Sequence, residues 1–95
     1  MRRHEIFTAL ADAKRREIVE SLAQHGTCTA TELAAGMPIT RQAVAKHLTH
    51  LHRAEIVEPR RAGRETHYRL NPGRLGDAID WLDDICTRAK ATEAG

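Results

Sequence analysis

The sequence predicts a single, mainly helical α+β domain spanning residues 1–95, and three observations support this class. Two short helix signals follow each other closely between residues 29 and 53, and a glycine-containing hairpin signal comes directly after them. Only one Phe, one Tyr and one Trp are present, so the core has to come mainly from aliphatic side chains on helices. A chain of 95 residues buries only a small core, which favours further burial in a dimer.

Two helices are expected at the start of the chain. The first spans about residues 3–10, and Asp12 then caps a second over 13–25 that Gly26 ends in a left-handed conformation. The basic run Lys14-Arg15-Arg16 is expected to form a solvated face, with a phosphate contact as the alternative. The apolar side chains expected on the packed sides of the two helices are Ile6, Phe7, Leu10, Ile18, Val19 and Leu22.

The next two helices are separated by a tight break. Thr29 is expected to cap the first, with Glu32 reaching back to complete a capping box, and Gly36 ends it. Thr40 caps the second, which spans about residues 41–53. Its buried stripe is expected to consist of Val44, Leu48 and Leu51. This arrangement predicts a helix-turn-helix whose second helix is the recognition helix.

A hairpin is predicted directly after the recognition helix. Residues 56–61 and 65–70 are β-prone and flank the turn Ala62-Gly63-Arg64. Pro59 cannot donate to a strand ladder, so it suits an edge strand. Residues 56–70 are therefore predicted to form a two-stranded wing with a basic tip, which makes the expected fold a winged helix-turn-helix.

A terminal helix is predicted from about residue 74 to 91. Asn71-Pro72-Gly73 is expected to break the chain before it. Its apolar residues recur at spacings of four and three, which is typical of an amphipathic helix. They are Leu75, Ile79, Leu82, Cys86 and Ala89, with Trp81 and Ile85 widening the stripe. A helix this apolar has to pack against something.

Basic residues are concentrated on the proposed recognition helix and wing. Residues 41–69 carry seven basic and three acidic side chains, whereas residues 1–40 carry five of each and residues 70–95 carry three and five. The surplus lies where phosphate contacts would be needed, and a solvated mixed-charge surface is the alternative. Neither a signal peptide nor a membrane-spanning run is visible, so we expect a cytoplasmic protein without a membrane partner.

Two stretches carry a family resemblance: AVAKHLTHL at residues 43–51 and the wing AGRETHYRL at 62–70. Through them residues 26–72 resemble the ArsR/SmtB family of winged-helix bacterial repressors, and residues 6–22 are similar to the opening helices of that family. The resemblance implies a homodimeric, sequence-specific DNA-binding regulator, a repressor of its own or adjacent genes. It also implies that the first and last helices form the dimer interface, where we expect Ile6, Phe7, Leu75, Ile79, Leu82 and Cys86.

The expected partner is double-stranded DNA with an imperfect inverted repeat. The start of a recognition helix is the part that reaches base edges in the major groove. Arg pairs with two atoms of guanine, and Gln pairs with two atoms of adenine. We expect base contacts from Arg41, Gln42 and Lys46, and phosphate contacts from Thr40, His47, Arg61 and Arg64. Ala45 can offer only a methyl group to thymine.

No metal or cofactor is expected. Many members of the resembled family bind thiophilic metals through a Cys-x-Cys pair, and the corresponding positions here are Thr29 and Thr31. Cys28 lies one position out of register, and a lone thiolate is a poor metal site. A second family site uses Asp and His on the last helices, but the last helix here offers Asp without His. His47 and His50, three residues apart, lack a matching third ligand.

Two alternatives remain open at the level of sequence. One is a winged-helix module for protein interactions, and the other is a thiol-responsive regulator that uses Cys28 or Cys86. No nucleophile with a base partner and no paired carboxylates are visible, so enzyme activity is not expected. The operator sequence, the regulated genes and any effector are not predicted.

Overall fold

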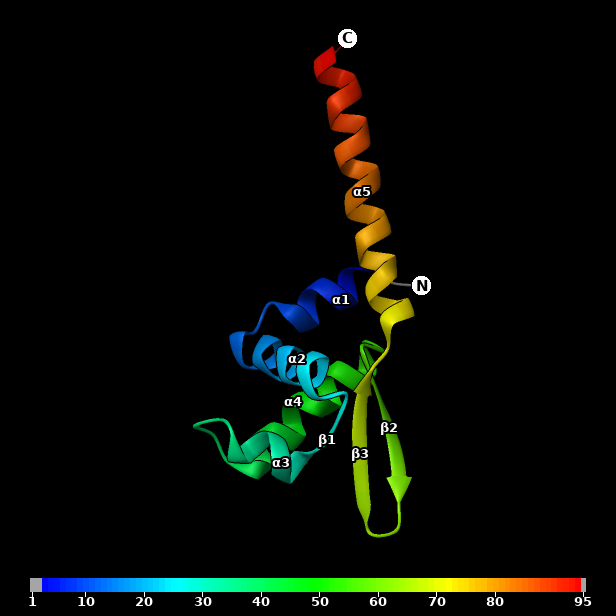
Figure 1. Cartoon of the computed structure of the whole chain (residues 1–95). Coiled ribbons are helices and arrows are strands. Elements are labelled where there is room, and N and C mark those ends of the chain that lie inside the picture. The colour runs from blue at the N-terminus through cyan, green and yellow to red at the C-terminus, as the bar shows by residue number, and fades with distance from the viewer. Residues whose placement is uncertain (1–2, 95) are drawn as a thin grey trace.

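The structure, a computed structural model, describes residues 3–94 and forms five helices and three strands in that range (Figure 1). They are α1 (Arg3–Leu10), α2 (Ala13–His25), β1 (Thr27–Thr29), α3 (Ala30–Ala35), α4 (Arg41–Arg53), β2 (Val57–Ala62), β3 (Glu65–Leu70) and α5 (Pro72–Ala94). Helices α1 to α4 form the body, from which the β2–β3 wing and α5 project in opposite directions. The predicted winged helix-turn-helix is confirmed. None of the described helices is long and apolar enough to cross a membrane.

The fully buried part of the core consists of aliphatic side chains from α1, α2, α4 and the segment that leads into β2. The fully buried ones are Ile6, Ile18, Leu22, Val44, Leu48, Leu51, Ile56 and Val57. Burying such a side chain contributes about 1.5–3 kcal/mol. The predicted stripe of α4 is thus confirmed, and its burial leaves the opposite face of α4 toward solvent.

The three predicted helix caps are all present. Asp12 Oδ1 accepts from two amides of the first turn of α2, and Thr40 Oγ1 accepts from the amide three residues on at 3.0 Å. In the capping box of α3, the amide of Glu32 donates to Thr29 Oγ1 at 3.1 Å and the amide of Thr29 donates to Glu32 Oε1 at 2.8 Å. The second bond lowers the pKa of Glu32, so the box is present at neutral pH and is lost as the pH falls through that lowered pKa.

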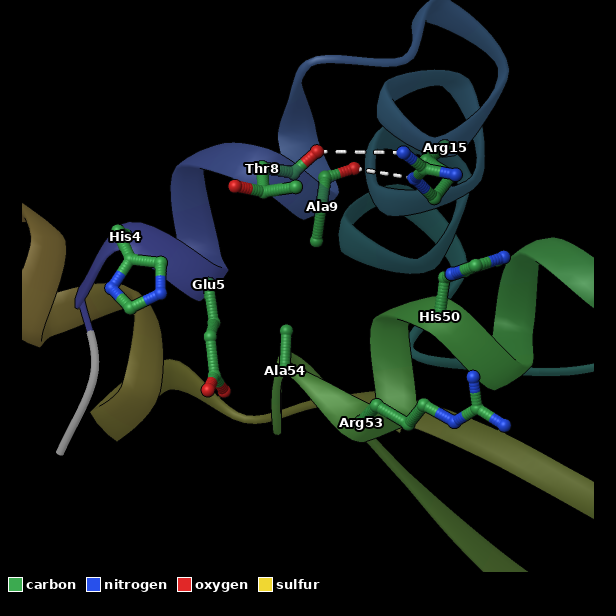
Figure 2. Close-up of a pocket in the computed structure, with 8 residues that line it drawn as sticks. All are labelled: His4, Glu5, Thr8, Ala9, Arg15, His50, Arg53 and Ala54. Carbon is green, nitrogen blue, oxygen red and sulfur yellow. Dashed lines mark hydrogen bonds between the residues drawn. The ribbon is translucent and has the colours of Figure 1, made fainter.

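The basic run of α2 differs from the expected solvated face. Arg15 Nε donates to the carbonyl oxygen of Ala9 at 2.6 Å, and Arg16 Nη1 donates to that of Leu10 at 2.8 Å. Figure 2 shows Arg15 reaching across to α1 above a cavity of about 390 Å³ between α1, α2 and α4. The two guanidinium groups therefore satisfy the last carbonyls of α1, which a helix end leaves without partners, and complement its dipole.

The sheet has one strand more than the predicted two-stranded wing. β1 pairs antiparallel with β3, with Thr27 opposite Arg69 and Thr29 opposite His67, so the strand order is β1-β3-β2. Pro59 lies on the edge strand β2, as expected. The turn between β2 and β3 is shorter than predicted, with Gly63 at φ +63°. The third strand attaches the base of the wing to the body.

Helix α5 is longer than predicted. Pro72 opens the helix instead of breaking the chain, because the first helical position needs no amide donor. The carbonyl of Asn71 accepts from the amides of Arg74 at 3.1 Å and Leu75 at 3.3 Å. The buried Arg74 then donates from Nε to the carbonyl of Ala54 at 2.8 Å. This bond joins the start of α5 to the end of α4.

The end of α4 contains a left-handed residue that is not glycine. Glu55 has φ +62°. Its amide donates to the carbonyl oxygen of His52 at 2.9 Å, and the amide of Ile56 donates to the carbonyl oxygen of Leu51 at 3.0 Å. These two bonds form a Schellman motif, whose left-handed position usually holds Gly. A residue with a Cβ atom is strained there by about 1–2 kcal/mol.

Replacing Glu55 by Gly is expected to stabilise the fold by about 0.5–1 kcal/mol, because the relief of strain exceeds the entropy that Gly adds to the unfolded chain. Thermal unfolding should show a rise of a few degrees in the midpoint. Glu55→Ala is the matched control, since it removes the carboxylate but keeps the Cβ atom. A midpoint for the Gly variant no higher than that of the Ala variant would rule out strain at this position.

Candidate nucleic-acid interface

The solvent face of α4 presents the predicted base-contacting residues together. Arg41, Gln42 and Lys46 are exposed, and Ala45 between them is half-buried. Gln42 and Lys46 lie on the side of the helix opposite its buried stripe, whereas Arg41, three residues before the buried Val44, is exposed in the first turn of the helix. The N-terminus of α4 is capped by the exposed Thr40, and the unpaired amides and dipole of a helix start attract phosphate. This surface therefore combines hydrogen-bonding groups for bases with a local positive potential.

A cleft of about 190 Å³ separates the start of α4 from the wing. It is lined by Thr29, Ala30, Thr31, Arg41, Ala45, Arg64, Glu65, Thr66 and Tyr68. Within it Arg41 Nε donates to Thr31 Oγ1 at 3.0 Å. This bond links the first helix of the motif to the second, and the sequence did not predict it.

The wing carries further exposed cations. Arg61 and Arg64 are exposed, as is Arg60, which was not among the predicted contacts. Arg61 Nε donates to the carbonyl of Gly63 at 3.3 Å across the turn. In contrast, Arg69 is paired with Glu58 at 3.1 Å, so its charge is compensated. The available positive charge of the wing is therefore concentrated towards its tip.

The side chain of His47 is less exposed to solvent than those of Gln42 and Lys46 on the same helix. It is half-buried, and its Nδ1 atom is buried without a hydrogen-bond partner in the described part of the chain. The pKa of Asp12 is lowered mainly by the backbone hydrogen bond from Arg15 and partly by the nearby His47. His47 thus sits at the flank of α4 that faces the start of α2, at the edge of the predicted contact surface.

Comparison with known proteins agrees with this geometry. A helix-turn-helix domain model matches residues 10–60. The HTH-type transcriptional regulator Rv2034 of Mycobacterium tuberculosis is 46% identical over 83 residues, which cover 87% of this chain and 77% of the relative. The transcriptional repressor SdpR of Bacillus subtilis is 33% identical over 79 residues, or 83% of this chain and 87% of the relative.

Among solved structures, an ArsR-like transcriptional regulator from Rhodococcus sp. RHA1 superposes with a TM-score of 0.87 at 34% sequence identity, covering 97% of this chain and 86% of that one. The chain belongs to the ArsR/SmtB family. Its function is therefore DNA-binding regulation of transcription, and it is not an enzyme. The alternative of a module used only for protein interactions is set aside by these relatives.

The threonines at the positions where many ArsR/SmtB proteins carry thiolates have structural roles here. Thr29 caps α3, and Thr31 accepts the hydrogen bond from Arg41. Cys28 is buried on β1, and burial raises the pKa of its thiol above the ordinary value. Among residues 3–94, no three His, Cys, Asp or Glu side chains lie close enough together to hold a metal ion.

Some of the residues predicted for the dimer interface of this ArsR/SmtB protein pack inside the single chain, and others point outward from α5. Ile6 is fully buried inside the single chain and offers no surface to a partner, so its assignment to the interface is wrong. Leu75 is half-buried against the same core. Phe7 packs on Trp81 with ring centroids 5.4 Å apart, which fixes α1 against α5. The outward residues of α5 include Ile79, Leu82, Ile85 and Cys86.

Proposed function

We propose that the chain is one protomer of a homodimeric repressor that binds an imperfect inverted repeat. The observation that carries this proposal is the pairing of an exposed, polar start of α4 with a cationic wing tip across one cleft. The single domain would span residues 1–95, with the recognition helix at 41–53, the wing at 56–70 and the terminal helix after it. The proposed site of action is the cytoplasm, where bacterial DNA lies.

In this proposal α4 enters the major groove and the wing follows the flanking backbone. Arg41, Gln42 and Lys46 contact base edges, and Ala45 offers a methyl group. The phosphate contacts are assigned to Thr40, His47, Arg61 and Arg64. Of these residues, His47 is half-buried at the flank of α4, so its contact would lie at the edge of the surface.

A second copy of the chain is the proposed cover for the apolar surface of α5. Ile79 is 64% exposed, Leu82 is 48% exposed and Ile85 is 38% exposed on α5, which projects from the body of the protomer (Figure 1). Such a row of large apolar side chains is a typical protein interface. A two-fold dimer would place two recognition helices on half-sites about one helical turn apart, or a multiple of it.

Replacing Arg41 or Gln42 by Ala is expected to relax preference at particular base pairs, because a bidentate contact is worth about 1–3 kcal/mol of discrimination. Arg64→Ala should instead weaken binding to all sequences to a similar degree, since phosphate carries no sequence information. The measurement is selection from a random duplex library, followed by affinities for the selected site and for single base-pair changes. If all three variants lower the affinity for every DNA site by the same factor, α4 does not read bases.

A further inference from the structure

We infer that Thr31 is a positioning residue that orients Arg41 for base recognition. The inference rests on the proposed function, in which Arg41 is a base-contacting residue. It concerns the hydrogen bond from Arg41 Nε to Thr31 Oγ1, which measures 3.0 Å and spans the turn between α3 and α4.

The hydroxyl of Thr31 is not needed for the local structure of α3. The cap of that helix is supplied by Thr29 and completed by Glu32. Thr31 lies one position into the helix and is exposed, and the bond to Arg41 is its contribution to the motif. A change at this position therefore tests the bond with little effect on folding.

The bond engages one edge of the guanidinium and leaves the other edge available. Of the five N–H donors of Arg41, the one on Nε is used by Thr31, and the four on the two terminal nitrogens are not. Two parallel bonds from the terminal nitrogens match O6 and N7 of guanine. Thr31 thus restrains the guanidinium through Nε, and the two terminal nitrogens stay available for a base.

Thr31 is also a neutral acceptor, so it orients Arg41 without compensating its charge. Glu65 lines the wing side of the same cleft and offers a charged alternative acceptor. Arg69 on the wing shows the effect of a charged acceptor. It is paired with the carboxylate of Glu58, which compensates its charge. A long side chain held in place beforehand also loses less rotamer freedom on binding. Both effects favour recognition of DNA by the held Arg41.

The test compares Thr31→Val, which removes the acceptor at constant shape, with Thr31→Ser, which keeps it. Sites selected by the unaltered protein are used to find the base pair at which Arg41→Ala loses discrimination, expected to be about 5- to 150-fold. At that base pair Thr31→Val should lower the preferred-to-changed affinity ratio by about 3- to 10-fold, while Thr31→Ser retains it. Thr66→Val, a matched change in the same cleft, should leave the ratio unaltered.

Three results separate the possibilities. An unaltered ratio in Thr31→Val, or an equal loss in Thr31→Ser, would overturn the positioning role while the proposed function stands. A base-pair profile unaffected by Arg41→Ala would overturn it as well, because Arg41 would then not read bases. Failure of the unaltered protein to select any sequence would instead remove the proposed function. Equal thermal midpoints for the Thr31 variants are expected and confirm that the comparison concerns recognition.

Discussion

Replacing Leu82 by Glu is expected to convert the protein from a dimer into a monomer. Leu82 is 48% exposed in the single chain, so a Glu side chain can reach water there and the fold of the protomer is retained. In the proposed dimer the same carboxylate would be buried without a partner, which costs several kcal/mol. Each 1.4 kcal/mol is a factor of ten in an equilibrium constant, so the dimer should dissociate at least about 100-fold more readily.

Sedimentation at micromolar concentration measures this directly. Thr87→Glu is the matched control, because it adds the same charge to α5 on the side away from the apolar stripe and should remain dimeric. A monomeric unaltered protein, or a dimeric Leu82→Glu variant, would contradict the proposed interface.

The two cysteines give a second readout of the same change. Cys86 lies one turn from Leu82 and is exposed in the single chain, so the proposed dimer should shield it from a thiol reagent and Leu82→Glu should expose it. Cys28 is buried and the pKa of its thiol is raised, mainly by burial, so it should react slowly in both proteins. Equal rates for Cys86 in the two proteins would contradict the interface.

The helix-turn-helix could be predicted because its signals are local. A capping box needs only Thr29 and Glu32, three residues apart, and the stripe of α4 needs only a periodicity within one helix. The strand β1 could not be predicted in this way. It has three residues, its last residue also caps α3, and its pairing is with β3, some forty residues later in the chain.

The direction of side chains was less predictable than the elements that carry them. Ile6 and Phe7 are adjacent apolar residues of α1, yet the first is fully buried in the core and the second lies at the surface against Trp81. The capping of α1 by Arg15 depends on how α2 folds back, and the bond between Arg41 and Thr31 depends on the turn between two helices. These contacts follow from tertiary packing, which the spacing of residue types does not specify.

Affinity for the operator is expected to fall about 1,000-fold between about 50 and 200 mM salt. A dimer that makes roughly six phosphate contacts releases a similar number of counterions. A plot of the logarithm of the affinity against the logarithm of the salt concentration should then have a slope near −5. The source of these contacts is the exposed charge at the start of α4 and at the wing tip. A flat dependence over this range would remove the DNA interface proposed here.

Two wing variants test which cations cause that slope. Arg64 is exposed at the tip, so Arg64→Ala should reduce the slope by about 1 for each protomer, or about 2 for a dimer. Arg69 is paired with Glu58 at 3.1 Å, so Arg69→Ala removes a cation whose charge is already compensated and should leave the slope nearly unchanged. Filter-binding titrations at several salt concentrations supply both slopes. If Arg69→Ala lowers the slope as much as Arg64→Ala does, the phosphate contacts come from the wing as a whole and not from its tip.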